Sequence, residues 1–401
     1  MKKLMVIIGL LAFFGNAYSQ WTPSNGLTNN NVTSFSYVEP TIFATLYEGG
    51  IFKSTDNGAN WNYSGLDNRI LNSSLCYNNK IYAGASTGIF YSANNGLNWS
   101  PLSGGLPIVS IKTFSVSNSF IFAGGFNLLG DFCLFKSSNN GVNWSTTNLI
   151  NQTINALTAF NNLIFAGTYN GIYISSNQGS NWILSNNGLT NHTIWSITRS
   201  DNNIYTGTNN GIYLTSNQGQ SWVNISNSST SQAILSVVVH ESKIIVGTYS
   251  NGIYLSTDQG TTWLNKNQGF NQIFPINVLI ISNNFLIAGT RGNYVWRRLL
   301  SEIIGIQKIG SNIPDKYSLS QNYPNPFNPS TNIKYQITNN KLVTLKVFDI
   351  LGKEIATLVK EKQNAGTYEA TFDGSGLTSG IYFYRLTCGD FSETKRMVLI
   401  K

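Results

Sequence analysis

Tryptophan recurs along this chain of 401 residues at a nearly constant interval. Successive members of the series lie 40, 38, 45, 38, 40 and 41 residues apart. The seven members are Trp21, Trp61, Trp99, Trp144, Trp182, Trp222 and Trp263. A repeat of about 40 residues indicates an architecture of successive units, each of which buries its apolar surface against the next unit.

An eight-residue motif ends at every member of the series except the first. It begins with Ser or Thr, has Asp or Asn at its third position and Gly at its fifth, and ends with Trp. The six copies begin at Ser54, Ser92, Ser137, Ser175, Thr215 and Ser256. We expect a turn in which the Asp or Asn side chain accepts backbone N–H bonds, the Gly adopts a positive φ, and the Trp holds the turn to its own unit.

Each unit contains four short stretches that favour β-strands. In the unit around Trp222 these are residues 194–197, 204–207 and 211–213, followed by a strand that starts at the tryptophan. Four strands repeated every 40 residues or so are typical of a β-propeller blade. The last unit, residues 277–297, has three strands, and the segment around Trp21 is expected to supply its fourth. The sequence therefore predicts an all-β, seven-bladed propeller over residues 20–299.

The composition changes after residue 299. Residues 300–314 are expected to form a connector, and Pro324, Pro326 and Pro329 then exclude a helix or a central strand in their neighbourhood. Apolar residues alternate with polar ones in segments 343–347, 368–372 and 382–386. This pattern predicts a small Ig-like β-sandwich over residues 315–401.

The first residues have the features of a secretory signal peptide. Lys2 and Lys3 precede an apolar stretch over residues 4–15, and the small residues Ala17 and Ser19 stand at the positions that determine cleavage. We therefore expect residues 1–19 to be removed on export.

Charge and cysteine usage narrow the classes of partner. Charged residues make up 10% of the chain, and its net charge of +8 is spread without a basic stripe, so nucleic acid is not an expected partner. Cys76, Cys133 and Cys388 have neither metal-ligand nor redox spacing and are expected to be small buried apolar residues. We expect a monomer with no metal and no cofactor.

The eight-residue motif resembles the Asp-box (BNR) repeat of sialidase-like propellers. That group includes sialidases, xyloglucanases, sortilin-type receptors and photosystem II assembly-factor propellers. The resemblance implies a structural role for the motif, and Asn in place of Asp in four copies keeps the capping oxygen. Its residues are Asp56, Trp61, Asn94, Trp99, Asn139, Trp144, Asn177, Trp182, Asn217, Trp222, Asp258 and Trp263.

The same resemblance implies which face of the propeller binds ligands. It is the face that carries the loops between the second and third strands of each blade and the loops that join the blades. Aromatic rings in these loops could stack on sugars, and polar side chains could bond them, so we expect recognition of a glycan or of an envelope or extracellular protein. The candidate binding residues are Tyr47, Glu48, Arg69, Tyr169, Asn209, Asn210, Tyr249, Phe274 and Arg291.

Catalysis is the alternative. Sialidases hold a carboxylate with three arginines, whereas only Arg69 and Arg291 fall in the loops of this face. A xyloglucanase-like site needs two opposed carboxylates, for which Glu48, Asp67 and Asp131 are the candidates. We therefore assign no catalytic residue, expect a binding protein, and keep a glycoside hydrolase as the alternative.

The third blade carries an insertion. From Gly124 to Ser137 the chain advances 13 positions, against 8 for the equivalent segment of three other blades. Its apolar residues Leu128 and Leu129 either contact a protein partner or pack beneath their neighbours, and both interpretations remain open.

Several motifs of the C-terminal domain resemble the type A sorting domain of type IX secretion. They are the Asn-Tyr-Pro-Asn-Pro-Phe-Asn-Pro run at 322–329 and residues 348–352, 379–386 and 395–401. The resemblance implies a Bacteroidota-like Gram-negative source, Sec export followed by type IX secretion, and a mature protein that is secreted or held at the outer-membrane surface. It also implies that the secretion machinery reads Gly380, Tyr382, Lys395 and Lys401.

Overall fold

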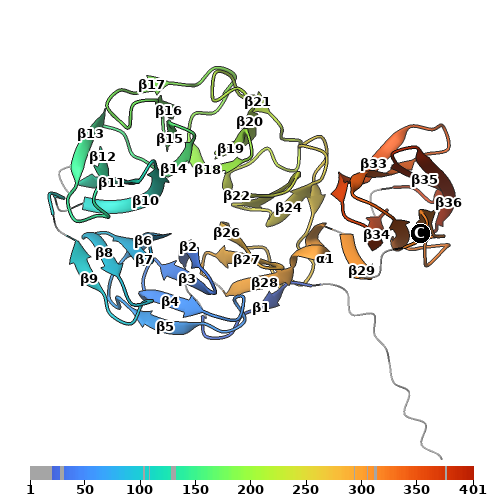
Figure 1. Cartoon of the computed structure of the whole chain (residues 1–401), viewed down its shortest axis with the longest axis horizontal. Helices are drawn as coiled ribbons and strands as arrows, with labels where there is room; N and C mark the ends of the chain where they lie inside the picture. Colours follow the sequence, from blue (N-terminus) through green and yellow to red (C-terminus); the bar gives the residue numbers. More distant parts are fainter. Residues whose placement is uncertain are drawn as a thin grey trace, which may run out of the picture.

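The computed structural model describes residues 20–27, 31–102, 104–107, 109–127, 132–292, 294–304, 306–310, 314–374 and 377–401. Seven four-stranded antiparallel sheets form a ring, and a sandwich of two further sheets lies outside it, beside the last blades (Figure 1). The predicted all-β fold, a seven-bladed propeller followed by a β-sandwich, is confirmed. The expected signal peptide lies outside the described residues.

In each of the first six blades, four strands that are consecutive in the sequence lie side by side, with the first nearest the central channel and the fourth at the outer rim (Figure 1). Blades 1 to 3 are β2 (Val32–Val38), β3 (Thr41–Leu46), β4 (Ile51–Ser54), β5 (Asn62–Gly65); β6 (Leu71–Tyr77), β7 (Lys80–Ala85), β8 (Gly88–Ser92), β9 (Ser100–Leu102); and β10 (Val109–Ser117), β11 (Phe120–Asn127), β12 (Phe132–Ser137), β13 (Ser145–Ile150). Blades 4 to 6 are β14 (Ala156–Phe160), β15 (Leu163–Thr168), β16 (Gly171–Ser175), β17 (Ile183–Leu184); β18 (Ile194–Ser200), β19 (Asn203–Thr208), β20 (Gly211–Thr215), β21 (Val223–Asn224); and β22 (Ile234–His240), β23 (Lys243–Thr248), β24 (Ile253–Ser256), β25 (Leu264–Asn265).

The seventh blade joins the two ends of the propeller. It combines β26 (Ile276–Ser282), β27 (Phe285–Thr290) and β28 (Val295–Leu299) with β1 (Thr22–Pro23), which pairs with β28. Trp21 is 2% exposed, stacks on Phe270 with ring centroids 5.1 Å apart, and donates its indole N–H to the Lys266 carbonyl at 2.6 Å. The prediction that the first segment completes the last blade is confirmed, and β1 covers the edge that β28 would otherwise expose.

The eight-residue motif forms the turn between the third and fourth strands. In the first copy the Gly58 N–H donates to Ser54 Oγ at 2.9 Å, and the Asn60 N–H donates to Asp56 Oδ1 at 2.9 Å. Gly58 has a φ of 76°, which favours glycine. The same two bonds recur in the other five copies. The predicted roles of the Asp or Asn and of the Gly are therefore confirmed.

The tryptophans do more than the sequence predicts. In four blades the indole N–H donates to a carbonyl of the preceding blade, at 2.6 to 3.1 Å. The pairs are Trp99 with Ser64, Trp222 with Ser185, Trp263 with Ile225 and Trp21 with Lys266. Trp182 instead bonds the Gly179 carbonyl of its own turn at 3.2 Å, as expected. The sequence predicts only that the Trp holds the turn to its own blade. These bonds also join neighbouring blades, because the outer part of the preceding blade offers its carbonyls to the indole.

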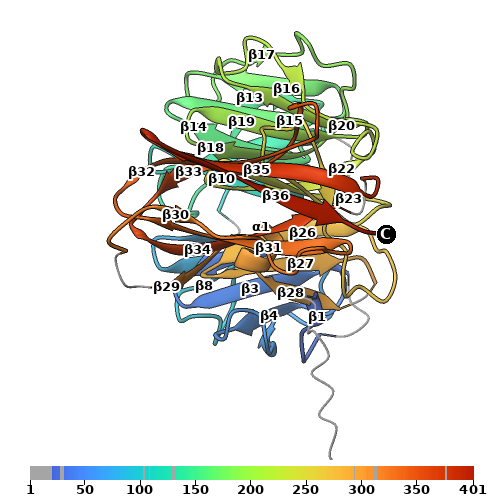
Figure 2. The ribbon, with the colours of Figure 1, turned by 90° about the vertical axis from the view of Figure 1, so that its right-hand side faces the viewer.

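The sandwich contains more of the chain than the predicted C-terminal domain. One sheet has the order β29 (Ile306–Gly310), β34 (Gly366–Asp373), β31 (Ser330–Ile337), β30 (Ser318–Leu319). The other has the order β33 (Glu354–Gln363), β32 (Lys341–Phe348), β35 (Gly380–Cys388), β36 (Phe391–Leu399) (Figure 2). Because β29 belongs to the first sheet, residues 306–310 of the expected connector are part of the sandwich.

The first five residues of the expected connector belong to the propeller. They form a single helical turn, α1 (Leu300–Ile304), whose Leu300 and Ile303 are buried beside Trp296 of the last blade. One direct bond between the two domains lies nearby, from Thr257 Oγ1 to the Thr357 carbonyl at 3.0 Å. The connector is thus structured on both sides rather than a free tether.

Candidate functional site

The loops that follow the second strand of each blade lie beside the loops that join the blades. The first residue after the second strand donates its backbone N–H to a carbonyl of the joining loop, at 2.9 to 3.1 Å. These pairs are Tyr47 with Asn31, Ser86 with Ile70, Asn209 with Thr193, Tyr249 with Ala233 and Arg291 with Pro275. We call the face that carries these two sets of loops the upper face. These bonds fix the backbone at Tyr47 and Tyr249, whose side chains keep 43% and 50% of their surface in solvent. Tyr169, at the equivalent position of blade 4, keeps 44%.

The innermost strands share a second feature at the upper face. In six blades their pairing with the second strand shifts by one residue, which leaves one residue of a β-bulge unpaired. The bulge residues are Thr33, Asn72, Lys112, Trp195, Leu235 and Asn277, and Asn155 stands at the equivalent position of blade 4. We call these seven residues the bulge ring, because they surround the upper mouth of the channel.

Four members of the bulge ring are committed to bonds with the next blade. Thr33 donates to the Leu71 carbonyl at 2.9 Å and Asn72 to Ser110 Oγ at 3.1 Å. The two remaining bonds join Asn155 to the Ile194 carbonyl at 3.1 Å and Asn277 to the Val32 carbonyl at 3.0 Å. These four side chains therefore join neighbouring blades. Among the described residues, Lys112, Trp195 and Leu235 make no bond of this kind.

Trp195 is the member of the bulge ring that contacts another aromatic ring across a blade boundary. Its ring lies 5.8 Å from that of Tyr169, measured between centroids, at an interplanar angle of 83°. Its indole N–H points to Asn209 Oδ1 at 3.4 Å. Blade 4 contributes Tyr169 and blade 5 the other two residues, so the three side chains meet across a blade boundary. We call Tyr169, Trp195 and Asn209 the aromatic corner, and it is the candidate binding site.

Sequence reasoning found two of the three residues of the corner. Tyr169 and Asn209 were candidates because of their loops, whereas Trp195 lies inside a stretch that reads only as an apolar strand. A signal was nevertheless present, since the chain has nine tryptophans and Trp195 is one of two outside the regular series. A tryptophan that a repeat does not require is a candidate for function.

Arg69 lies elsewhere, in a groove of about 690 Å³ at the boundary of blades 1 and 2. Its guanidinium lies 4.4 Å from the centroid of the Phe90 ring, and Nη1 points to Thr87 Oγ1 at 3.5 Å. Asp67 lines the same groove, and its backbone N–H donates to the Tyr63 hydroxyl at 2.9 Å. Blade 3 separates this groove from the aromatic corner.

The remaining upper-face candidates are distributed around the ring. Glu48 follows Tyr47 in blade 1, Arg291 belongs to blade 7, and Asn210 donates its backbone N–H to Thr208 Oγ1 at 3.1 Å; all three are exposed. Asp131, Leu128 and Leu129 lie outside the described residues.

Phe274 does not belong with the candidate binding residues. It is 4% exposed and packs against Trp296, with ring centroids 6.2 Å apart, and against Phe270 at 6.4 Å. The apolar core between blades 6 and 7 takes up this side chain, so it stabilises the fold instead of meeting a ligand.

The residues expected to act in sorting occupy the strands β35 and β36 and the end of the chain. Gly380 begins β35, and Tyr382 is 7% exposed, with its hydroxyl donating to the Thr378 carbonyl at 2.7 Å. Lys395 pairs with Glu393 at 3.1 Å, and the Lys401 N–H donates to Ser379 Oγ at 2.9 Å. Tyr382 is thus part of the sandwich core, whereas Lys395 and Lys401 lie nearer the surface.

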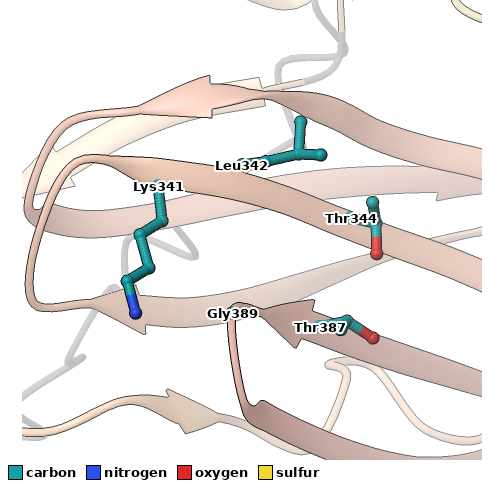
Figure 3. A pocket seen from close by; sticks show the side chains of 5 residues that line it. All are labelled: Lys341, Leu342, Thr344, Thr387 and Gly389. Carbon is teal, nitrogen blue, oxygen red and sulfur yellow. The ribbon is translucent and has the colours of Figure 1, made fainter.

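A second hollow, of about 320 Å³, lies on the sandwich. Figure 3 shows its lining along β32 and β35 and at the turn after β35. The lining residues are Lys341, Leu342, Thr344, Thr387 and Gly389. They include one cation and no acid, so this hollow supplies no acid–base pair.

Within the described ranges, no group of three His, Cys, Asp or Glu side chains is placed to hold a metal ion. None of the described helices is long and apolar enough to cross a membrane. Cys76 and Cys388 are free thiols, and burial raises the pKa of Cys76 to about 11, which keeps it protonated and unreactive near neutral pH.

Residues 321–401 match the family model described as the secretion system C-terminal sorting domain. Among solved structures, YCF48 from Cyanidioschyzon merolae is similar with a TM-score of 0.56 and 13% identity, over 71% of this chain and 99% of that one. A structure of YCF48 bound to D1 peptide has a TM-score of 0.56 at 13% identity, over 70% of this chain and 95% of that one. The computationally designed Ika8 protein has a TM-score of 0.51 at 12% identity, over 69% and 99%. No curated protein matches the sequence.

At such low identity the likeness to solved structures shows the fold alone. The C-terminal match is more specific, because it indicates type IX secretion and hence a protein that is secreted or displayed at the cell surface in Bacteroidota. It also implies that this domain interacts with the type IX secretion machinery. The chain is therefore a β-propeller protein that carries a secretion system C-terminal sorting domain.

Proposed function

We propose that the propeller binds a glycan at the aromatic corner once the protein has left the cell. The observation that carries this proposal is the perpendicular pair formed by Tyr169 and Trp195, which remain partly open to solvent on the upper face. A sugar ring can lay its C–H face on one aromatic ring while its edge contacts the other. The Asn209 side chain supplies amide groups that bond sugar hydroxyls.

The corner is held in place before any ligand arrives. The bulge fixes the backbone of Trp195, and the indole points to Asn209. At the Tyr169 loop, Thr168 Oγ1 donates to the Gly171 carbonyl at 2.9 Å and accepts the Asn170 N–H at 2.9 Å. A preorganised site loses little conformational entropy on binding, which favours a recognition role.

We infer binding rather than hydrolysis. Cleavage of a glycosidic bond requires two carboxyl groups across the bond, and the upper-face loops of blades 4 and 5 contain no Asp or Glu. Glu48, Asp67 and Asp131 are the acids that a glycoside hydrolase would have to use. The resemblance of the turn motif to the Asp-box repeat is compatible with either role, since that group includes enzymes and receptors.

A protein partner is the second candidate. It is favoured by the similar structure of YCF48 bound to D1 peptide, which shares the propeller fold. In that case a peptide would occupy the upper face instead of a sugar chain.

The test is a glycan-binding assay of residues 20–401 on a broad set of bacterial, plant and animal polysaccharides, with release of reducing ends followed in parallel. We expect binding without turnover, and a loss of about tenfold or more in affinity for Trp195→Ala or Tyr169→Ala. Tyr47→Ala is the matched control, because Tyr47 stands at the equivalent loop position with similar exposure but in another blade. Turnover would contradict the binding role, and equal losses in all three variants would contradict the location.

A further inference from the structure

Lys112 is the one charged member of the bulge ring. It stands in β10 of blade 3, at the position where blades 7, 1, 2 and 4 place a Thr or Asn that bonds the next blade. Its ammonium group lies instead 5.7 Å from the centroid of the Phe126 ring of its own blade. Lys112 is partly buried, so its charge is partly shielded from bulk solvent at the upper face.

This cation has no carboxylate to balance it among the residues that the structure describes. Several other buried or partly buried lysines have a partner for their ammonium group: Lys243 pairs with Glu241 at 3.2 Å and Lys395 with Glu393 at 3.1 Å. Lys53 and Lys136 donate to the carbonyls of Asn95 at 3.1 Å and Gln178 at 3.0 Å. Burial lowers the pKa of Lys112, which records the cost of keeping its charge away from water. The Phe126 ring offsets part of that cost. An anion at the channel mouth would offset more of it.

The place of Lys112 relative to the aromatic corner suggests what that anion belongs to. The innermost strand of blade 4 lies between those of blades 3 and 5, so Lys112 and Trp195 belong to the same ring, two blades apart. Packed sheets lie about 10 Å apart, so two such steps exceed the size of one sugar. A ligand that reaches both residues is an extended chain with several units.

We propose that the glycan bound at the aromatic corner is an acidic polysaccharide, and that Lys112 binds one of its carboxylate or sulfate groups. This inference rests on the proposed function, because it names the class of glycan that the corner receives. One unit of the chain stacks on Trp195 and Tyr169, and an acidic unit further along the chain reaches the ammonium group. The cation thereby selects among glycans that the aromatic rings alone would not distinguish.

The experiment measures the affinity of residues 20–401 for three polymers: polygalacturonate, which carries carboxylates, chondroitin sulfate, which carries carboxylates and sulfates, and β-1,4-galactan, which is neutral. We expect at least one acidic polymer to bind about tenfold more tightly than the galactan. That preference should weaken in high salt, because salt screens the ion pair. Desulfated chondroitin, which keeps the backbone and carboxylates of chondroitin sulfate, is a fourth probe that shows whether a sulfate is needed.

Variants of Lys112 then assign the preference to this residue. Lys112→Met, which keeps most of the side-chain volume, should remove the preference for acidic polymers and leave galactan binding unchanged, whereas Lys112→Arg should retain it. Lys136→Met is the matched control, since Lys136 belongs to the same blade and also lies over a phenylalanine, 5.9 Å from the Phe120 centroid. Thermal unfolding of each variant separates loss of binding from loss of the fold.

The remaining outcomes overturn the inference in distinguishable ways. If a neutral glycan binds as tightly as the acidic polymers and Lys112→Met has no effect, the ligand is not selected by charge, while the proposed glycan-binding function stands. If no glycan of any class binds, both the inference and the proposed function fail.

Discussion

Tyr169 and Trp195 belong to neighbouring blades, yet their rings meet at 83° with centroids 5.8 Å apart. Neither ring is needed to build a blade, since Tyr169 lies in a loop and Trp195 occupies a bulge. At the equivalent bulge positions of four other blades, short polar side chains bond the neighbouring blade. Blade 5 therefore gives up one bond between blades and gains an aromatic surface at the mouth of the channel.

Closure of the ring by the first segment is predicted to dominate the stability of the propeller. Trp21→Ala removes a buried indole that stacks on Phe270 and bonds Lys266, and should lower the free energy of unfolding by about 3–5 kcal/mol. Trp21→Phe keeps an aromatic ring but loses the N–H and should cost less than the Ala variant. Urea unfolding of residues 20–401 measures both, and a loss below about 1 kcal/mol for Trp21→Ala would show that the closure is dispensable.

The turn motif is predicted to need an acceptor oxygen but no charge. Asp56→Asn should leave the free energy of unfolding nearly unchanged, because four natural copies hold Asn and make the same bond to the backbone. Asp56→Ala removes the acceptor of the Asn60 N–H and should cost about 1 kcal/mol. Similar unfolding curves for the Ala and Asn variants would mean that the side-chain oxygen contributes little.

Lys266 is predicted to make stability rise with pH above neutrality. Burial, reinforced by the Arg298 guanidinium, lowers the pKa of Lys266 to about 8, although the Asp373 carboxylate acts in the opposite direction. Between pH 8 and the usual lysine value near 10.5, the unfolded chain binds more protons than the folded one, so the free energy of unfolding increases with pH. Below pH 8 the folded protein carries the full cost of the buried charge.

The measurement compares urea unfolding of the native chain and of Lys266→Met at pH 7.5 and pH 10. The native protein should gain on the order of 1 kcal/mol more than the variant over this interval, a figure reduced because Lys266 keeps part of its surface in water. Lys316→Met, at an exposed position of the sandwich, should behave like the native chain. Parallel pH profiles for all three proteins would rule out a titration at Lys266.

The propeller was predictable because its signals repeat. The tryptophans recur at a nearly constant interval, and the turn motif with its local hydrogen bonds occurs six times. These repeats predict the four-stranded blade, the number of blades and the closure of the ring without knowledge of distant contacts. The boundary between the two domains was harder to predict from the sequence, because Leu300 and Ile303 pack against the last blade and β29 pairs with β34 of the sandwich. Both are tertiary contacts that leave no local pattern.

The candidate site was only half predictable for a related reason. Their position in loops identifies Tyr169 and Asn209. Whether a loop residue such as Phe274 is exposed or buried depends on the packing between blades, which the sequence does not show. Trp195 and Lys112 become visible through a register shift of one residue, which places side chains of an inner strand at the channel mouth. A bulge of this kind cannot be read from an apolar stretch.

The most direct test of the account is a crystal structure of residues 20–401 with the oligosaccharide that binds most tightly. We predict a sugar ring in contact with the Trp195 indole at about 4 Å and an acidic group within about 3 Å of Lys112 Nζ. A sugar chain in the groove beside Arg69 and Phe90, or a ligand that leaves Trp195 untouched, would contradict it.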